Sequence, residues 1–284
     1  MTVERIYLGC PSWGMKSWVG RCFPRGTTQT DFLRTYSRIF NSVEGNTTFY
    51  ALPKADNVAR WRDEVPDDFR FCFKFPKKVT HEKLLLDSAE YVDAFLERLA
   101  PLGPKLGSLI VQLPPRFGFK QLGRLGDFLR GLPKEFRYAV ELRHPVFFAA
   151  GDEERAAADM FRELGVDTVV MDARGLHSSD NPELAEVRER KPDLPIVMRA
   201  TGPQPIVRCV PHEDFSAGVR FVEPWIEQLS KWIAEGKRPY FFMHAPDDTY
   251  APDNAYRFHR LLSGRVAVGD LPPWAGKDDQ LGLF

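Results

Sequence analysis

The stretch YAVELRHPVFFAAGDEERAAADMFRELGVDTVVMDA, residues 138–173, contains one complete strand–helix–strand unit. Its apolar runs at 138–143 and 168–173 are typical of buried strands, and residues 153–164 between them repeat apolar side chains at helical spacing. This order is the signature of two parallel strands joined by a crossover helix. Because similar units recur along the chain, this pattern decides the fold class.

Working outward from this unit, short apolar runs predict six further strands. They cover residues 6–12, 42–48, 71–76, 108–114, 196–201 and 240–244. Segments with helical periodicity lie between most of them, at 31–40, 57–64, 88–99, 122–132, 219–234 and 254–262. Eight units of about 33 residues match the usual size of a (β/α)8 barrel, and no GxGxxG motif follows the first strand to indicate a dinucleotide-binding sheet. We therefore predict a single TIM-type barrel over residues 1–284, with 265–284 as a C-terminal tail.

The composition narrows the class of protein. The 284 residues include 39 Lys and Arg and 39 Asp and Glu, and zero net charge disfavours a strongly basic nucleic-acid-binding protein while leaving a local basic groove open. No apolar run approaches the roughly 20 residues that span a bilayer, and the start MTVERIYLG lacks a signal-peptide stretch. The four cysteines show no CxxC spacing. These features predict a cytoplasmic protein with reduced thiols and no membrane association.

Polar side chains recur on one face of the predicted strands, near the C-terminal end of each strand. Successive strand residues point to opposite faces, and barrel active sites lie at the C-terminal ends of the strands. We expect these side chains to converge on one mouth of the barrel. They are Glu44, Lys74, Gln112, Glu141, Arg143, Asp172, Arg199 and His244.

This set of residue types fits acid–base chemistry on an anion. Carboxylates with a histidine suit general acid–base catalysis, which makes Glu44, Glu141, Asp172 and His244 candidate catalytic residues. The cations Lys74, Arg143 and Arg199 suit a carboxylate or phosphate ligand. The alternative is a charge-compensated network that only satisfies buried groups. No ligand spacing such as HExxH is present and the cations compete for the acids, so no metal site is predicted.

The predicted mouth loops carry aromatic residues that either stack a base or sugar or cover the edge of the core. They are Trp13, Trp18, Phe23, Phe49, Tyr50, Phe117, Phe147 and Phe148. After the third predicted strand, a cluster around His81 is either a phosphate-facing patch or a solvated loop. His144, which precedes a proline, is either a ligand-binding residue or a cap of the strand end.

Five motifs in order over the first half of the chain resemble the domain of unknown function 72, or YecE-like, family. They are YLGCPSWGMKSWVGRCFP (7–24), FNSVEGNTTFYALP (40–53), FRFCFKFPKKVTH (69–81), LGSLIVQLPPRF (106–117) and YAVELRHPVFF (138–148). The resemblance implies a TIM-type barrel of unestablished activity, and fold-level analogy to apurinic-endonuclease and xylose-isomerase barrels suggests nucleic-acid or sugar-phosphate ligands. Its motif positions are Glu44, Asn46, Thr48, Phe49, Tyr50, Lys74, Thr80, His81, Gln112, Pro114, Glu141, Arg143, His144 and Arg199. The chain departs from the family pattern at Gly45, at His244 and after Arg199.

The leading hypothesis is an enzyme, a hydrolase or a lyase, that acts on a phosphate-bearing sugar or nucleic acid at the C-terminal mouth. Its predicted ligand-binding residues are Trp13, Asn46, Tyr50, Lys74, His81, Gln112, Arg143, His144 and Arg199. One alternative is a non-catalytic module that binds single-stranded nucleic acid or another ligand. A further alternative is a metal-dependent, nuclease-like hydrolase. The sequence identifies no cofactor and no oligomeric state.

Overall fold

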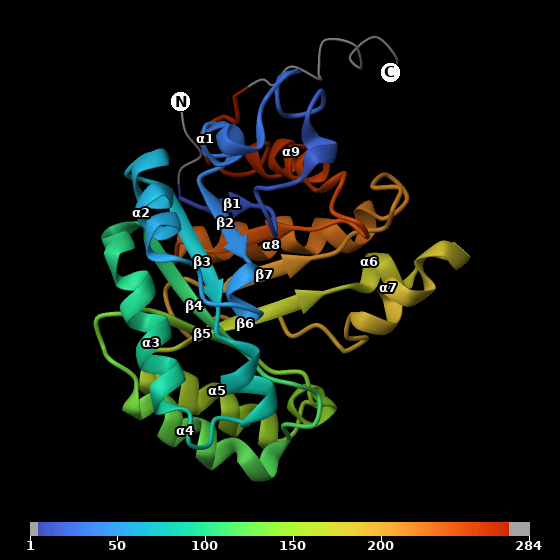
Figure 1. Cartoon of the computed structure of the whole chain (residues 1–284). Helices are drawn as coiled ribbons and strands as arrows, with labels where there is room; N and C mark the ends of the chain where they lie inside the picture. Colours follow the sequence, from blue (N-terminus) through green and yellow to red (C-terminus); the bar gives the residue numbers. More distant parts are fainter. Residues whose placement is uncertain (1–4, 273–284) are drawn as a thin grey trace.

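The computed structural model describes residues 5–272, and within this range eight parallel strands form one sheet that curls into a barrel (Figure 1). The strands are β1 Tyr7–Gly9, β2 Ser42–Gly45, β3 Arg70–Lys74, β4 Leu106–Gln112, β5 Tyr138–Glu141, β6 Asp167–Asp172, β7 Ile206–Cys209 and β8 Tyr240–Met243. Their order around the sheet is β1-β8-β7-β6-β5-β4-β3-β2. From β2 to β8 each strand therefore pairs with its neighbours in the chain, β1 pairs with β8, and the ends of the sheet are β1 and β2.

The contact between β1 and β2 closes the barrel. The backbone N–H of Glu44 donates to the carbonyl of Cys10 over 3.0 Å, just beyond the end of β1. At the other end of the strand, the N–H of Leu8 donates to Asn41 Oδ1 over 2.8 Å, and Asn41 Nδ2 donates to the carbonyl of Ile6 over 2.9 Å. These bonds satisfy backbone N–H and C=O groups along β1 and β2 that hydrogen bonds between two paired strands satisfy in a regular sheet. The fold is a (β/α)8 TIM-type barrel, as the sequence predicts.

Amphipathic helices cover the outside of the barrel, except for α6 and α7. The helices of the described chain are α1 Phe32–Tyr36, α2 Ala55–Glu64, α3 Ala89–Leu99, α4 Leu122–Gly131, α5 Asp152–Leu164, α6 Arg174–His177, α7 Ala185–Arg190, α8 Val219–Ala234 and α9 Ala251–Ser263. In α3, the buried residues Val92, Phe95, Leu96 and Leu99 follow the spacing of one helical face. This burial anchors each long helix to the sheet, and most predicted helices are confirmed to within a few residues.

The connection between β6 and β7 is different. Figure 1 shows α6 and α7 standing off the side of the barrel, and no helix of the described chain joins them back to β7. Instead, residues 192–205 run without regular secondary structure beside β6. Thr168 Oγ1 donates to the carbonyl of Arg199 over 2.6 Å, and Thr201 Oγ1 donates to that of Val166 over 2.7 Å. The segment therefore covers part of the outer face of β6.

The prediction that residues 196–201 form the seventh strand is wrong. The seventh strand is Ile206–Cys209, which pairs in parallel with β6 and β8. The two runs IVMR and IVRC are similar and lie ten residues apart, and only the second completes the ladder between two strands. As a result, Arg208, not Arg199, is the basic residue on the inner face of the seventh strand.

The barrel interior is filled by a compact apolar layer beneath the C-terminal mouth. It contains Tyr7, Cys72, Ile110, Ala139, Val169, Ile206, Tyr240 and Phe242. The rings of Tyr7 and Tyr240 stack with their centroids 4.4 Å apart. Because this layer sets which residues of each strand point inward, the next inward residues toward the C-terminal ends form the floor of the mouth.

Gly45 ends β2 and lies against Phe73 of β3. A Cβ at this position would lie 2.3 Å from Cε1 of Phe73 on the neighbouring strand, so a side chain does not fit. We predict that Gly45→Ala lowers the free energy of unfolding by about 1–3 kcal/mol through overpacking. Urea unfolding measures this change. Gly123→Ala is the matched control because Gly123 lies exposed in α4 with nothing within 4 Å of its Cβ position, and it should gain about 0.5–1 kcal/mol. Equal effects at both positions would contradict the explanation.

No helix within residues 5–272 is long and apolar enough to cross a membrane. The predicted C-terminal tail begins after α9, where Val268 and Leu271 are buried. Its residues 273–284, including Trp274, lie outside the described residues.

Candidate functional site at the barrel mouth

A cavity of about 340 Å³ opens at the C-terminal mouth of the barrel. Its floor is formed by Lys74 at the end of β3, Gln112 at the end of β4 and Arg208 on β7. The rest of its wall comes from Pro11, Asn46, Phe49, Tyr50, Arg143, Val187, Arg190, Lys191, His244, Pro246 and Asp248. The mouth therefore joins residues from most of the barrel's strand ends.

Arg208 lies at the centre of the floor and is held by two buried carboxylates. Its Nε and NH2 donate to the two oxygens of Glu44 over 2.7 and 2.9 Å, and its NH1 donates to Glu141 Oε2 over 2.7 Å. The three residues are 2%, 0% and 1% exposed, respectively. A bidentate contact and a third charge-assisted bond fix the guanidinium in one orientation. Sequence reasoning missed Arg208 because it assigned the seventh strand to the earlier run.

Lys74 and Arg143 complete the network. Lys74 Nζ lies 3.1 Å from Glu44 Oε1, and Arg143 Nε donates to Glu141 Oε1 over 2.5 Å. Burial opposes ionisation of both carboxyls, but the nearby cations outweigh it. They hold the pKa of Glu44 well below its usual range and lower that of Glu141 to about 2. Both carboxylates are therefore ionised at neutral pH, and their proton affinity is low.

His244 follows β8 and is the buried histidine of the mouth. Its Nε2 lies 3.5 Å from Glu44 Oε2, outside the distance of a good hydrogen bond, and its Nδ1 lies 3.7 Å from Asp248 Oδ1. Burial lowers its pKa, which keeps the imidazole neutral near pH 7. A neutral imidazole between two carboxylates can accept a proton, and this is the state that general base catalysis requires.

Two further cations reach the cavity from the end of α7, and sequence reasoning missed both. Arg190 forms an exposed ion pair with Glu186, 2.6 Å apart on the same helix. Lys191 lines the cavity half-buried and has no carboxylate partner within the described residues. Burial, and then Arg208, lower the pKa of Lys191. No strand carries these residues, so no alternation pattern in the sequence indicates their position.

The charges in and beneath the cavity do not cancel. Apart from the Arg190–Glu186 pair, the four cations Lys74, Arg143, Lys191 and Arg208 face three carboxylates. These carboxylates are Glu44, Glu141 and Asp248. One positive charge is left over, so the network is more than a self-neutralising structural cluster and an anion would complete it.

The same cavity contains polar atoms without a partner. Asn46 donates through Nδ2 to the carbonyl of Pro11 over 3.0 Å, while its Oδ1 is buried and accepts no hydrogen bond within residues 5–272. Gln112 Oε1 and His244 Nε2 are likewise buried without a hydrogen-bond partner among the described residues. Unsatisfied buried polar atoms are costly, so their convergence on one cavity indicates groups that a ligand satisfies. Tyr50, at 81% exposure, stands at the rim.

Asp172 does not point into the mouth, contrary to the prediction. Its carboxylate accepts bonds from Arg174 Nε and NH2 over 3.0 and 2.8 Å, and from Trp225 Nε1 of α8 over 2.7 Å. The inward residue of β6 is Val169, so Asp172 lies on the outward face with Val170. Asp172 thus joins the end of β6 to an outer helix, and its predicted catalytic position is wrong.

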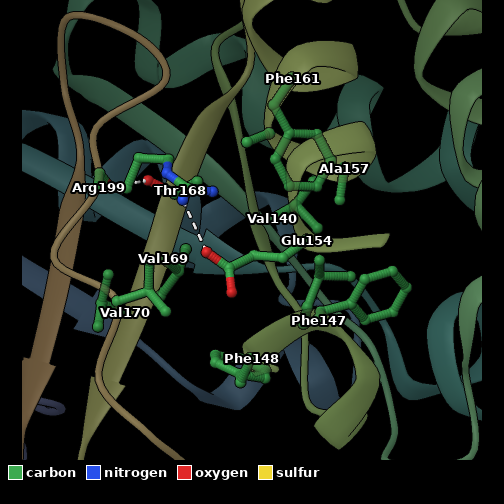
Figure 2. Close-up of a pocket in the computed structure, with 13 residues that line it drawn as sticks. Val140, Phe147, Phe148, Glu154, Ala157, Phe161, Thr168, Val169, Val170 and Arg199 are labelled. Carbon is green, nitrogen blue, oxygen red and sulfur yellow. Dashed lines mark hydrogen bonds and ion pairs between the residues drawn. The ribbon is translucent and has the colours of Figure 1, made fainter. Parts of the chain in front are cut away.

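Arg199 also lies elsewhere. Figure 2 shows it on the outer side of the barrel, where it approaches Glu154 across an otherwise apolar pocket. Arg199 NH2 donates to Glu154 Oε1 over 2.7 Å. The pocket is lined by side chains of β5, β6 and α5, including Val140, Val170 and Phe161. The predicted mouth position of Arg199 is wrong because residue 199 belongs to the segment that covers β6 from outside.

Three other predicted ligand-binding residues lie outside the cavity lining. Trp13 packs edge-on against Trp61 of α2, with the ring centroids 5.2 Å apart. His144 Nδ1 accepts from the N–H of Val146 over 3.2 Å and so caps the start of the short 3-10 helix Pro145–Phe148 that follows β5. The ring centroids of His81 and Phe49 lie 5.0 Å apart. Burial together with Arg143 and Arg116 lowers the pKa of His81 to about 4. These three side chains support the loops around the mouth.

Most of the loop aromatics cover the edge of the core. Trp18, Phe23, Phe117 and Phe147 are buried, whereas Tyr50 is the strongly exposed member of the set. The stacking surface considered for single-stranded nucleic acid is therefore reduced to the rim around Tyr50 and the half-buried Phe49.

The fold and this mouth define a TIM-type barrel with a buried, charge-mixed site at its C-terminal end. The chain belongs to the family described as protein of unknown function DUF72, whose family model matches residues 7–276. It is 39% identical over 250 residues to the UPF0759 protein YecE of Escherichia coli K12, covering 87% of this chain and 89% of the relative. It is 29% identical over 205 residues to the UPF0759 protein YunF of Bacillus subtilis, covering 69% and 66%.

Solved structures of the same family share the fold. A DUF72 family protein of Thermotoga maritima superposes with a TM-score of 0.67 at 22% identity, covering 91% of this chain and 99% of that chain. A DUF72 family protein of Enterococcus faecalis gives a TM-score of 0.69 at 20% identity, covering 94% and 98%. At this level of identity the likeness concerns the fold.

Proposed function

We propose that the protein is an enzyme that binds a small phosphate-bearing ligand in the mouth cavity and moves a proton on it. The observation that carries the proposal is the uncompensated positive charge around the cavity. Arg208 uses three of its donors on the two glutamates and Lys74 contacts Glu44, so Lys191 and Arg143 remain to hold an anion. Arg and Lys side chains in such an enclosed setting bind phosphate strongly.

A phosphorylated sugar suits the cavity better than inorganic phosphate alone. The unpartnered acceptors Asn46 Oδ1 and Gln112 Oε1 require hydrogen-bond donors, which sugar hydroxyl groups supply. Tyr50 and Phe49 offer ring faces or edges at the rim, where a sugar packs. A volume of about 340 Å³ lies within the size range of small-ligand sites.

His244 is our candidate for the proton-transferring group, with Asp248 beside it. Glu44 and Glu141 are too acidic to act as general acids at neutral pH, so the role we assign them is to hold Arg208 and Lys74 in place. The sequence-based hypothesis of a hydrolase or lyase is kept, with these glutamates as positioning residues. A cytoplasmic location belongs to the same proposal, supported by four buried unpaired cysteines in the described chain.

The two alternative functions have weaker support. A single-stranded nucleic-acid site needs several exposed stacking residues along a basic groove, and most loop aromatics here are buried. Its test is the salt dependence of binding to an oligonucleotide, which falls steeply when several phosphates are neutralised. For a metal-dependent nuclease, no group of three His, Cys, Asp or Glu within residues 5–272 is placed to hold a metal ion.

Removing Lys191 should weaken phosphate binding. We predict that Lys191→Gln raises the Kd for glucose 6-phosphate by about tenfold, since a charge-assisted hydrogen bond contributes about 1.5–3 kcal/mol. Isothermal titration calorimetry measures the change, with glucose as the ligand that lacks phosphate. Lys231→Gln is the matched control because Lys231 is exposed on the outer helix α8. If the Lys191 and Lys231 variants bind alike, or if the native protein binds no phosphorylated sugar, the proposal is wrong.

A further inference from the structure

Lys74 is the one lysine of the cavity floor, and its position differs from that of an ordinary anion-binding lysine. It is the last residue of β3 and points inward, with 7% of its surface exposed. Its ammonium nitrogen lines the mouth cavity and lies 3.1 Å from Glu44 Oε1. A ligand bound in the cavity therefore meets Nζ at the end of a rigid strand, where a reacting atom can be positioned closely.

The charges that face Lys74 come from every neighbouring element. They are Glu44 of β2, Glu141 of β5, Arg143 after β5, Arg208 of β7 and Lys191 after α7, with His244 after β8. Glu44 already binds Arg208 through both oxygens, so Lys74 shares the negative charge of Glu44 with Arg208, which makes two hydrogen bonds to it. The ammonium form of Lys74 is thus poorly compensated where it stands.

Burial, and then Arg208, lower the pKa of Lys74 to about 8, against about 10.4 for an exposed lysine. At pH 7.5 about a quarter of Lys74 is then the neutral amine, compared with about 0.1% of an exposed lysine. Desolvation next to another cation is a known way to prepare a lysine as a nucleophile toward carbonyl compounds.

We propose that Lys74 is a catalytic residue that forms a Schiff base with the carbonyl carbon of an aldose or ketose phosphate bound in the mouth. The inference rests on the proposed function, because Lys191 and Arg143 must hold the phosphate group. It deepens that function by naming the substrate class, a phosphorylated sugar in its open carbonyl form, and it assigns the reaction to covalent amine catalysis.

The chemistry balances without any further reagent. The neutral amine of Lys74 attacks the carbonyl carbon, an N–C bond forms, and the π electron pair moves to the carbonyl oxygen. The nitrogen gives up two protons and the oxygen takes up two, so that the C–O bond breaks and one water leaves as the imine forms. His244 is placed to carry these protons. The imine nitrogen then takes up one proton from solvent, and Glu44 and Glu141 stabilise the protonated imine by charge.

Reductive trapping tests the inference. The full-length protein is mixed at pH 7.5 with glyceraldehyde 3-phosphate, reduced with sodium borohydride, and analysed by intact mass and peptide mapping. We expect one dominant adduct on Lys74, at least tenfold more abundant than on any other lysine. Glyceraldehyde without phosphate should modify Lys74 much less, because it lacks the group that the cations hold.

Variants separate the covalent role from a purely electrostatic one. Lys74→Arg keeps the positive charge beside Glu44, so it should retain phosphate-ligand binding by calorimetry and lose the adduct. Lys77→Met is the matched control, because Lys77 is an exposed lysine on the next loop, and it should keep the adduct on Lys74. Lys74→Met, checked for folding by circular dichroism, should also lose the adduct.

The outcomes distinguish the two proposals. Adducts spread over surface lysines, with phosphate binding intact, would overturn the role of Lys74 and leave the phosphate site standing. Loss of both the adduct and phosphate binding in the native protein would overturn both. An adduct on Lys74 that does not depend on the phosphate group would overturn the named substrate class.

Discussion

Arg208→Met should lower the free energy of unfolding by about 3–5 kcal/mol at neutral pH. The substitution removes the cation that three hydrogen bonds join to Glu44 and Glu141, and both carboxylates are almost completely buried. Lys74 and Arg143 remain, but each contacts only one carboxylate. The variant therefore leaves oxygens of Glu44 and Glu141 buried without their hydrogen-bond donors. Urea unfolding, followed by tryptophan fluorescence, measures the loss.

Arg190→Met is the matched control for this prediction. Arg190 also forms an ion pair and also lies near the mouth, but the side chains of Arg190 and Glu186 are 71% and 81% exposed. Exposed pairs contribute about 0–1 kcal/mol, so the control should change stability little. Equal costs for the two Arg→Met variants would show that the network does not carry this energy.

The strand positions could be predicted well because each buried strand is a short apolar run between turn residues. The seventh strand was the exception, since IVMR at 196–199 and IVRC at 206–209 are equally good runs. Spacing offered a signal that composition did not. β6 begins at residue 167 and β8 at 240, and the observed start of β7 at 206 lies close to their midpoint. Because the prediction assigns the seventh strand to the earlier run, it places Arg199, which lies outside the barrel, in the site.

The direction of side chains was predictable only where polar and apolar residues alternate. In β3 and β5 polar residues follow the alternation, and Lys74 and Glu141 are found at the mouth as expected. β8 is apolar throughout, and the prediction for His244, which the structure also places at the mouth, depended on its position directly after that strand. In β6, Val169, Val170 and Met171 are all apolar, so alternation could not tell which face Asp172 takes. Lys191 follows a short helix inserted between strands, and its approach to the cavity depends on the tertiary path of that insertion.

The stability of the protein should fall by about 3 kcal/mol or more as the pH is lowered from 4 toward 2. The fall comes from Glu141, whose pKa is lowered to about 2 by Arg143 and Arg208 against the effect of burial, and from Glu44. A lowered carboxyl pKa stabilises the folded state above the unfolded pKa of about 4.3, and this contribution disappears as pH falls through the folded value. For Glu141 the difference is about 3 kcal/mol at 1.36 kcal/mol per pKa unit.

Between pH 6.5 and 4, other buried groups act in opposite directions. His81, His244 and His259 have lowered pKa values, so the unfolded chain takes up their protons first and stability is lost below about pH 6.5. Burial raises the pKa of Asp167 to about 6, so its folded form binds a proton first and stability is gained as pH falls from about 6 to 4. Asp167→Asn removes that gain, so the variant should lose stability more steeply than the native protein between pH 6 and 4. Urea midpoints measured from pH 7 to 2 test both curves, and equal slopes for the two proteins between pH 6 and 4 would contradict the assignment of Asp167.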